Sequence, residues 1–169
     1  MKAQSRLLLF IVLVAAMFAV AYSARAWQPL DQSSPATKTA TNASEADLAA
    51  IKQTALDYIE SYYEGNAERM ERALHPDLAK RIVHTDPKSG RSRLDQMSAM
   101  SLVLGTRARA SRPTPKDKQQ KDVTVLDVFE NAASVKIVAT DWIDYLHVAK
   151  FNGRWVIVNV LWELKPQQK

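Results

Sequence analysis

The dipeptide Asn152-Gly153 constrains the fold of this chain more than any other feature. It separates two segments, 143–151 and 154–163, in which apolar residues recur at every second position. Asn and Gly best tolerate the positive φ angles of a type I′ turn, so the sequence predicts a two-residue β-hairpin. Such a turn fixes the register, with Phe151 opposite Arg154 and Ile143 opposite Trp162.

This register assigns every side chain of the hairpin to one of two faces. The first face is apolar apart from two residues, so we expect it in the core; it holds Ile143, Tyr145, His147, Ala149, Phe151, Arg154, Val156, Val158, Val160 and Trp162. The second face mixes apolar residues with Asp144, Lys150, Asn159 and Glu163, which indicates a partly covered back face. Its apolar patch predicts a homodimer through the back face of the sheet; the patch consists of Trp142, Leu146, Trp155, Ile157 and Leu161.

The first 26 residues have the pattern of a secretory signal peptide. Lys2 and Arg6 precede an apolar run of about 15 residues, shorter than the roughly 20 that cross a bilayer as a helix. Small residues follow, and we expect cleavage after Ala26, with cleavage after Ser23 as an alternative. The other interpretation of this segment is an uncleaved N-terminal membrane anchor. The mature protein is therefore expected to be periplasmic or secreted. The chain has no cysteine, which excludes a lipidated-cysteine anchor and disulfides.

Charge gives no indication of nucleic-acid binding. The formal net charge of +5 falls to +2 without residues 1–26, which contain three basic residues and no acidic one. Six further basic residues crowd into the segment 107–121, which has two prolines and no aromatic residue. Nucleic-acid binders carry basic residues on an ordered face with aromatics among them, so we interpret 107–121 as a solvated connector, with contact to an anionic surface as the alternative.

The rest of the chain divides into a flexible linker at 27–43 and one domain at 44–165. Ser44 and Asp47 resemble a capping box, and apolar residues at helical spacing predict a helix that Gly65 ends. A short second helix follows from Asn66. A helical turn at 77–79 and a small hairpin across 87–90 then lead to a third helix from Leu94 to Gly105.

After residue 121 the apolar pattern changes to period two. Strands are predicted at 123–129 and 133–140, followed by the two strands of the hairpin. Helices first and an antiparallel sheet afterwards predict an α+β domain.

The order of these elements resembles the nuclear transport factor 2-like superfamily, whose cone-shaped fold packs three N-terminal helices on a curved antiparallel sheet. Particular segments resemble its bacterial "putative lumazine-binding" family, which is related to SnoaL-like proteins. These segments are 56–66, 74–76, 133–136, 144–150 and 153–159. The resemblance covers nearly all of 44–163 and implies a cone between helix and sheet. It does not imply one activity, because the superfamily includes enzymes, transport adaptors and binding proteins.

The interpretation that we favour is an exported protein that binds a small apolar or aromatic molecule in the cone. The expected ligand-binding residues are Tyr58, Tyr62, Tyr145, His147 and Trp162. One alternative is an isomerase, dehydratase or cyclase with His147 as general base and Tyr145 as donor. By the register Asp144 lies on the other face and could orient His147 only if a bulge intervened, which weakens this alternative. The other alternative is an envelope interaction module that uses the back face of the sheet.

The sequence indicates neither a metal nor a cofactor. The three histidines, His75, His84 and His147, lack the spacing of a metal site, and no glycine-rich phosphate loop is present. Beyond the N-terminal segment, nothing predicts contact with a membrane.

The N-terminal pattern makes a direct prediction about processing. In its native host the mature chain should begin at or near Trp27 and should be found outside the cytoplasm. N-terminal sequencing of protein from fractionated cells tests this. An intact 7–21 segment in the membrane fraction would indicate an anchored domain, and a full-length chain in the cytosol would contradict export.

Overall fold

The computed structural model describes residues 43–166, so the predicted signal peptide and almost all of the predicted linker lie outside the described residues. Three α-helices occur in this part of the chain, α2 (Glu45–Glu64), α3 (Ala67–Ala73) and α4 (Ala99–Ala108), together with the short 3-10 helix Lys116–Lys118. None of the helices within 43–166 is both long enough and apolar enough to cross a bilayer.

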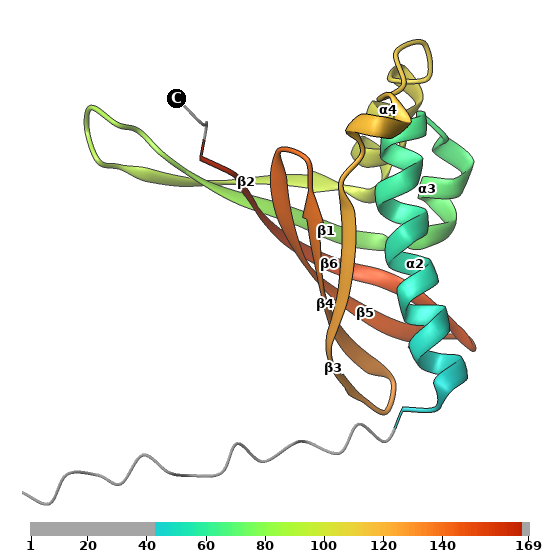
Figure 1. Cartoon of the computed structure of the whole chain (residues 1–169). Helices are drawn as coiled ribbons and strands as arrows, with labels where there is room; N and C mark the ends of the chain where they lie inside the picture. Colours follow the sequence, from blue (N-terminus) through green and yellow to red (C-terminus); the bar gives the residue numbers. More distant parts are fainter. Residues whose placement is uncertain (1–42, 167–169) are drawn as a thin grey trace, which may run out of the picture. The chain divides into compact units, whose positions relative to one another are not determined.

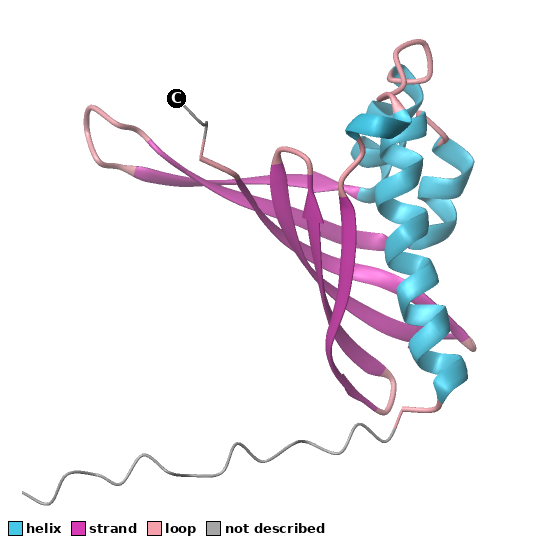
Figure 2. Cartoon of the chain, viewed as in Figure 1, coloured by secondary structure: helices cyan, strands magenta, loops and turns pink. Residues whose placement is uncertain are grey.

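Six strands form one curved sheet that does not close on itself. They are β1 (Leu74–Thr85), β2 (Ser92–Ser98), β3 (Lys121–Phe129), β4 (Ala132–Ala139), β5 (Trp142–Phe151) and β6 (Arg154–Leu164). Their order in the sheet is β2-β1-β6-β5-β4-β3, and all neighbours are antiparallel except β1 and β6. The helices lie on one side of the sheet, and the β1–β2 hairpin extends away from them (Figures 1 and 2). The predicted α+β, cone-like fold is confirmed.

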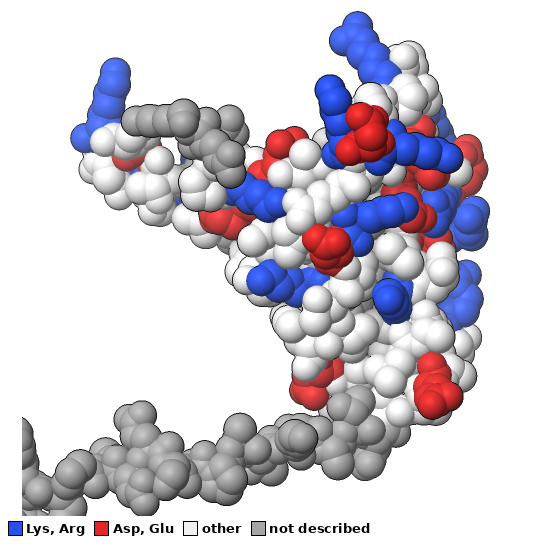
Figure 3. Space-filling view, in the orientation of Figure 1, with Lys and Arg blue, Asp and Glu red and all other residues white. Residues whose placement is uncertain are grey.

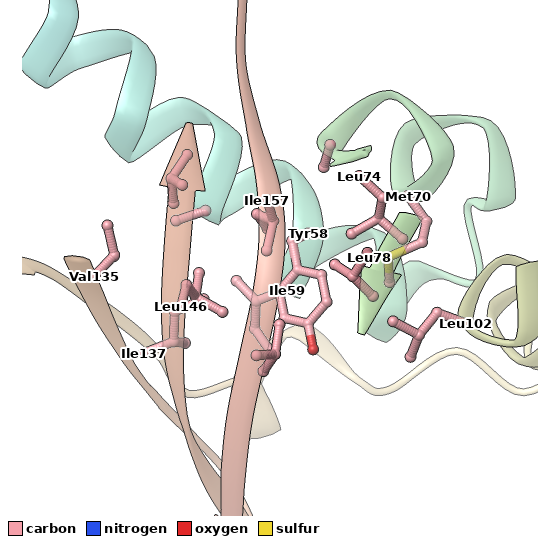
Figure 4. Close-up of a cluster of buried hydrophobic side chains, with 14 of the residues drawn as sticks. Tyr58, Ile59, Met70, Leu74, Leu78, Leu102, Val135, Ile137, Leu146 and Ile157 are labelled. Carbon is pink, nitrogen blue, oxygen red and sulfur yellow. The ribbon is translucent and has the colours of Figure 1, made fainter. Parts of the chain in front are cut away.

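Both ends of α2 form as the sequence predicts. The Ser44 side chain accepts a hydrogen bond from the backbone N–H of Asp47, and Gly65 ends the helix in the left-handed conformation with φ 71°. Side chains on the inner face of α2, including Tyr58 and Ile59, pack against the sheet and against Met70 and Leu102 of the other two helices (Figure 4). The helix thus forms one wall of the space that the curved sheet encloses.

Hydrogen bonds to Asp47 hold the first turn of α2 against the β5–β6 hairpin. The Asp47 carboxylate accepts hydrogen bonds from Lys150 Nζ at 2.9 Å and from Trp155 Nε1 at 2.8 Å. These hydrogen bonds lower the pKa of Asp47 to about 2, and the bond from Lys150 has the larger effect. The charge of Lys150 led us to predict a partly solvated face. Asp47 neutralises this charge, and α2 covers this face.

The hairpin register is confirmed near its turn and wrong beyond it. Phe151 pairs with Arg154, and the predicted pairing continues to Val148 and Ile157. A β-bulge at Val158 then shifts β6 by one residue, so that Trp162 lies opposite Asp144 instead of Ile143. Because side chains alternate along a strand, the shift moves Trp162 to the same face as Asp144.

The assignment of the two faces is also wrong. The buried inner face carries Asp144, Leu146 and Val148 of β5, whereas Tyr145 and His147 lie exposed on the outer face. The acidic side chain of Asp144 led us to expect it outside the core, but Lys80 of β1 and Trp142 of the same strand satisfy its carboxylate.

The apolar patch proposed for the back face of the sheet does not exist as predicted. Leu146, Trp155 and Ile157 are buried, and Trp142 is half-buried; only Leu161 is exposed, at 50%. The predicted homodimer remains a prediction, and these buried residues do not support it.

Three further features of the secondary structure differ from the predictions. Residues 77–79 continue strand β1 instead of forming a helical turn, and residues 92–98 form β2, so the third helix begins at Ala99 and not at Leu94. The helix also continues beyond Gly105 to Ala108. Pairing of 79–85 with 92–98 explains the late start of the third helix, since hydrogen bonds to a neighbouring strand override a helical apolar pattern.

Gly65 and Gly105 should respond in opposite ways to replacement by alanine. A Cβ at Gly65 would lie 2.4 Å from the Ala110 Cα and would occupy the left-handed conformation, whereas a Cβ at Gly105 has no atom within 4 Å. We expect Gly65→Ala to lower the free energy of unfolding by more than about 2 kcal/mol, and Gly105→Ala to raise it by up to about 1 kcal/mol. Urea denaturation measures both. Equal effects at the two positions would contradict this account of the turn after α2.

Candidate functional site

A cavity of about 500 Å³ opens between α2, α4 and the adjoining strands β1, β5 and β6. Its walls are mainly apolar and include four aromatic side chains. The lining residues are Tyr58, Ile59, Tyr62, Met70, Lys80, Met97, Ser101, Leu102, Gly105, Arg109, Trp142 and Trp162. Cavities of this size and character bind small molecules in many proteins.

A buried ion pair lies at the inner end of the cavity. Lys80 of β1 donates a hydrogen bond from Nζ to Asp144 Oδ1 of β5 at 2.8 Å. Both residues are buried, with Lys80 6% exposed and Asp144 completely buried. The second carboxylate oxygen, Oδ2, accepts a hydrogen bond from Trp142 Nε1 at 2.7 Å, so both oxygens of Asp144 have partners.

Aromatic rings surround the Lys80 ammonium group. Nζ lies 4.8 Å from the centre of the Trp162 ring, 5.3 Å from that of Tyr58 and 5.9 Å from that of Trp142. It also donates a hydrogen bond to the Tyr58 hydroxyl oxygen at 2.6 Å. The faces of aromatic rings carry partial negative charge, so these contacts help to compensate for the water that Lys80 loses on burial.

Burial shifts the pKa values of two of these groups. Desolvation lowers the pKa of Lys80, and the charge of Asp144 offsets part of this effect. Desolvation also raises the pKa of Tyr58 well above its usual value, with a further contribution from the charge of Asp144. Tyr58 therefore keeps its proton at neutral pH, and its hydroxyl group can donate a hydrogen bond while accepting one from Lys80.

Trp162 lines the cavity, and its indole N–H is a donor without an acceptor in the described part of the chain. Its Nε1 atom is buried and has no hydrogen-bond partner among residues 43–166. Buried donors in folded proteins nearly always have an acceptor. Nε1 has almost no accessible surface, so it does not face the open space of the cavity.

The more exposed part of the cavity wall is formed by α4 and by the residue that follows it. Ser101 and Gly105 are exposed residues on the lining face of α4, and Arg109 is partly buried directly after the helix. The Arg109 guanidinium carbon lies 4.4 Å from the centre of the Tyr62 ring, which links this part of the wall to α2. Gly105 lines the cavity, and a Cβ at this position would have no atom within 4 Å.

The structure brings together three of the five residues predicted to bind a ligand. Tyr58, Tyr62 and Trp162 line the cavity. Tyr145, which is 46% exposed, and His147 lie on the opposite face of the sheet and do not line it. Their predicted place in the cone is wrong because the faces of β5 are reversed relative to the expectation.

Four polar or aromatic residues at the site were missed by the sequence analysis: Lys80, Asp144, Arg109 and Trp142. Arg109 was assigned to a solvated connector, but α4 continues far enough to hold it in the cavity wall. A prediction of β1 as a strand would have revealed Lys80, because the alternation of side chains along that strand places Lys80 on the inner face. No group of three or more His, Asp or Glu side chains that could hold a metal ion occurs within 43–166.

The charges of Lys80 and Asp144 should be strongly coupled, because each is buried and each is the other's ionic partner. Removing one partner leaves a buried charge, so we expect Lys80→Met or Asp144→Leu to lower the free energy of unfolding by about 3–5 kcal/mol. The double variant Lys80→Met/Asp144→Leu should recover most of that loss. Urea denaturation of the four proteins forms a double-mutant cycle that measures the coupling.

The exposed pair Arg93–Asp95 provides the matched control, since its side chains are 74% and 45% exposed. Its coupling should be below about 1 kcal/mol. Equal coupling energies in the two pairs would contradict the role that we assign to burial of Lys80.

Comparison with known protein structures supports the fold. Similar structures include nuclear transport factor 2-like proteins of unknown function from Methylobacillus flagellatus KT (20% identity, TM-score 0.59) and Shewanella baltica OS155 (18% identity, TM-score 0.56). Each match covers 75% of this chain and 98% or 100% of the other one. A third, from Silicibacter pomeroyi DSS-3, has 16% identity and a TM-score of 0.55, with 70% and 95% of the two chains covered. At these identities the likeness shows the fold alone.

Sequence comparison identifies the family. No curated protein matches the chain at a significant level. The family model described as "Putative lumazine-binding" matches residues 46–163, which include the whole cavity. The chain therefore belongs to the putative lumazine-binding family.

Proposed function

We propose that this protein binds a small, planar and largely apolar molecule in the cavity between α2, α4 and the sheet. The observation that carries the proposal is the composition of the cavity wall. Tyr58, Tyr62, Trp142 and Trp162 surround a space of about 500 Å³, within the range of about 300–1,000 Å³ typical of small-molecule sites. Large aromatic surfaces next to such a space favour a flat ring system.

Polar groups at the inner end of the cavity would orient this ligand. The Trp162 Nε1 donor, which has no acceptor among residues 43–166, would suit an acceptor atom on the edge of a ring once the neighbouring side chains that cover it move. The Lys80–Asp144 pair holds Trp142 and Tyr58 in place through the hydrogen bonds described above. An arrangement fixed in advance loses little entropy when a ligand binds.

The description of the family agrees with this chemistry. Lumazine is a fused bicyclic heteroaromatic compound with carbonyl acceptors, and a molecule of this shape suits the aromatic walls. We therefore include lumazine and related fused-ring compounds among the first candidates.

We also propose that binding takes place outside the cytoplasm. The proposal rests on the basic, apolar and small-residue order of residues 1–26. Such a protein would hold its ligand in the periplasm or in the medium.

The structure favours neither alternative interpretation. A general base must reach the substrate, and His147 lies on the face of the sheet opposite the cavity. An interaction module working through Leu146, Trp155 and Ile157 would need these residues exposed, and they are buried.

Partial blocking of the cavity should weaken ligand binding without unfolding the protein. Gly105→Phe would place a ring in the free space beside α4, whereas Leu104→Phe changes an exposed neighbour that does not line the cavity. Binding can be followed as the rise in melting temperature with a panel of bicyclic and tricyclic aromatic compounds, including lumazine. We expect compounds that stabilise the wild type to stabilise Leu104→Phe equally and to bind Gly105→Phe about 10-fold more weakly or worse, which corresponds to about 1.4 kcal/mol. A wild-type protein that no member of the panel stabilises would contradict the proposal.

A further inference from the structure

We infer that the ligand is an acid, and that its carboxylate binds Arg109 while its aromatic ring occupies the cavity. This inference rests on the proposed function, because it specifies the class of molecule that the same cavity binds. It also assigns to Arg109 the role of a specificity-determining residue.

The charges of the cavity wall carry the first part of the argument. Among residues 43–166, only two cationic residues line the cavity, Lys80 and Arg109, and no aspartate or glutamate of this part of the chain lines it. The charge of Lys80 is neutralised by Asp144, which lies just behind the wall. Arg109 takes part in none of the ion pairs within 43–166, so its charge has no carboxylate partner in this part of the chain.

The position of the Arg109 side chain carries the second part. Its Nε donates a hydrogen bond to the Tyr62 carbonyl oxygen at 3.3 Å, and its Nη2 donates one to Thr114 Oγ1 at 3.2 Å. The guanidinium group also stacks on the Tyr62 ring. These contacts fix the group in place but use only part of its five donors, and Nη1 donates to no residue within 43–166. A guanidinium held in this way is prepared to bind a carboxylate.

The aromatic wall connects Arg109 to the inner end of the cavity. The Tyr62 ring, on which Arg109 stacks, lies 5.3 Å from the Trp142 ring in an edge-to-face arrangement. Trp142 in turn donates to Asp144. A flat ligand lying along Trp142 and Tyr62 would therefore bring a substituent at its outer edge close to Arg109.

The surroundings of Arg109 are basic as well. Arg107, Arg112, Lys116 and Lys118 belong to the same stretch of chain, and Asp117 is its single acidic residue. In Figure 3 several Lys and Arg side chains project from the end of the molecule where Figure 1 places α4. Such a cluster attracts anions to this end of the cavity.

A purely structural role for Arg109 makes a different prediction. Its contacts with Tyr62 and Thr114 join α2 to the segment after α4, and losing them would disturb the cavity for every ligand alike. A role in specificity instead predicts that neutral ligands keep their affinity and that only acids lose it.

The experiment compares matched acids and amides. Naphthalene-2-carboxylate and anthracene-2-carboxylate are each titrated into the full chain beside their primary carboxamides, by calorimetry at low salt. We expect each acid to bind the wild type about 10-fold more tightly than its amide, because a hydrogen bond to a charged partner is substantially stronger than a neutral one. Arg109→Gln should remove this preference and leave the amide affinity unchanged.

Two further variants separate charge from geometry. Arg107→Gln makes the same change of charge at an exposed position of α4 that does not line the cavity, and it should keep the preference for the acid. Arg109→Lys keeps the charge but not the planar donor group, and it should keep part of the preference.

The outcomes distinguish this inference from the proposed function. Equal binding of acid and amide to the wild type would overturn the inference and leave the proposed function intact. A preference for the acid that persists in Arg109→Gln would also overturn it, as would an equal loss of acid and amide binding in that variant. If neither compound of either pair binds the wild type, both the inference and the proposed function fail.

Discussion

The buried ion pair between Lys80 and Asp144 is the interaction on which the arrangement of the site depends. The two residues come from β1 and β5, which are separated in the sheet by β6, so the pair spans the strand between them. A buried charge without a partner would be strongly destabilising, which ties the position of each strand to that of the other. Through its second oxygen Asp144 fixes Trp142, and through its ammonium group Lys80 fixes Tyr58. One pair of charges thus orients Trp142 and Tyr58, two of the four aromatic side chains that line the cavity.

A local irregularity of the sheet positions a third of these aromatic side chains. The bulge at Val158 moves Trp162 to the inner face, opposite Asp144. In a regular ladder without the bulge, Trp162 would lie opposite Ile143 on the outer face, and Leu161 would take its place opposite Asp144. β-Bulges are frequent next to functional sites, where they redirect a side chain. Its position here agrees with a role in shaping the cavity.

Much of the fold could be predicted from local patterns, and the candidate site only in part. Caps such as Ser44 and Gly65 and the turn at Asn152-Gly153 act through the backbone of a few neighbouring residues, so the sequence reveals them directly. The faces of β5 depend instead on partners far along the chain. Asp144 is charged, and only the presence of Lys80, 64 residues earlier, explains why it is buried. The same reason explains why Tyr58 and Tyr62 on α2 were placed correctly and Tyr145 and His147 were not.

The central claim is that the aromatic cavity holds a small molecule. Native mass spectrometry of the full-length gene product, purified from its own host without denaturation, tests it most directly. The account predicts that wild-type protein carries a small-molecule adduct that is lost on denaturation, and that the Gly105→Phe variant carries much less of it. The mass of the polypeptide alone for both proteins, together with no change in wild-type melting temperature across the aromatic panel, would contradict the account.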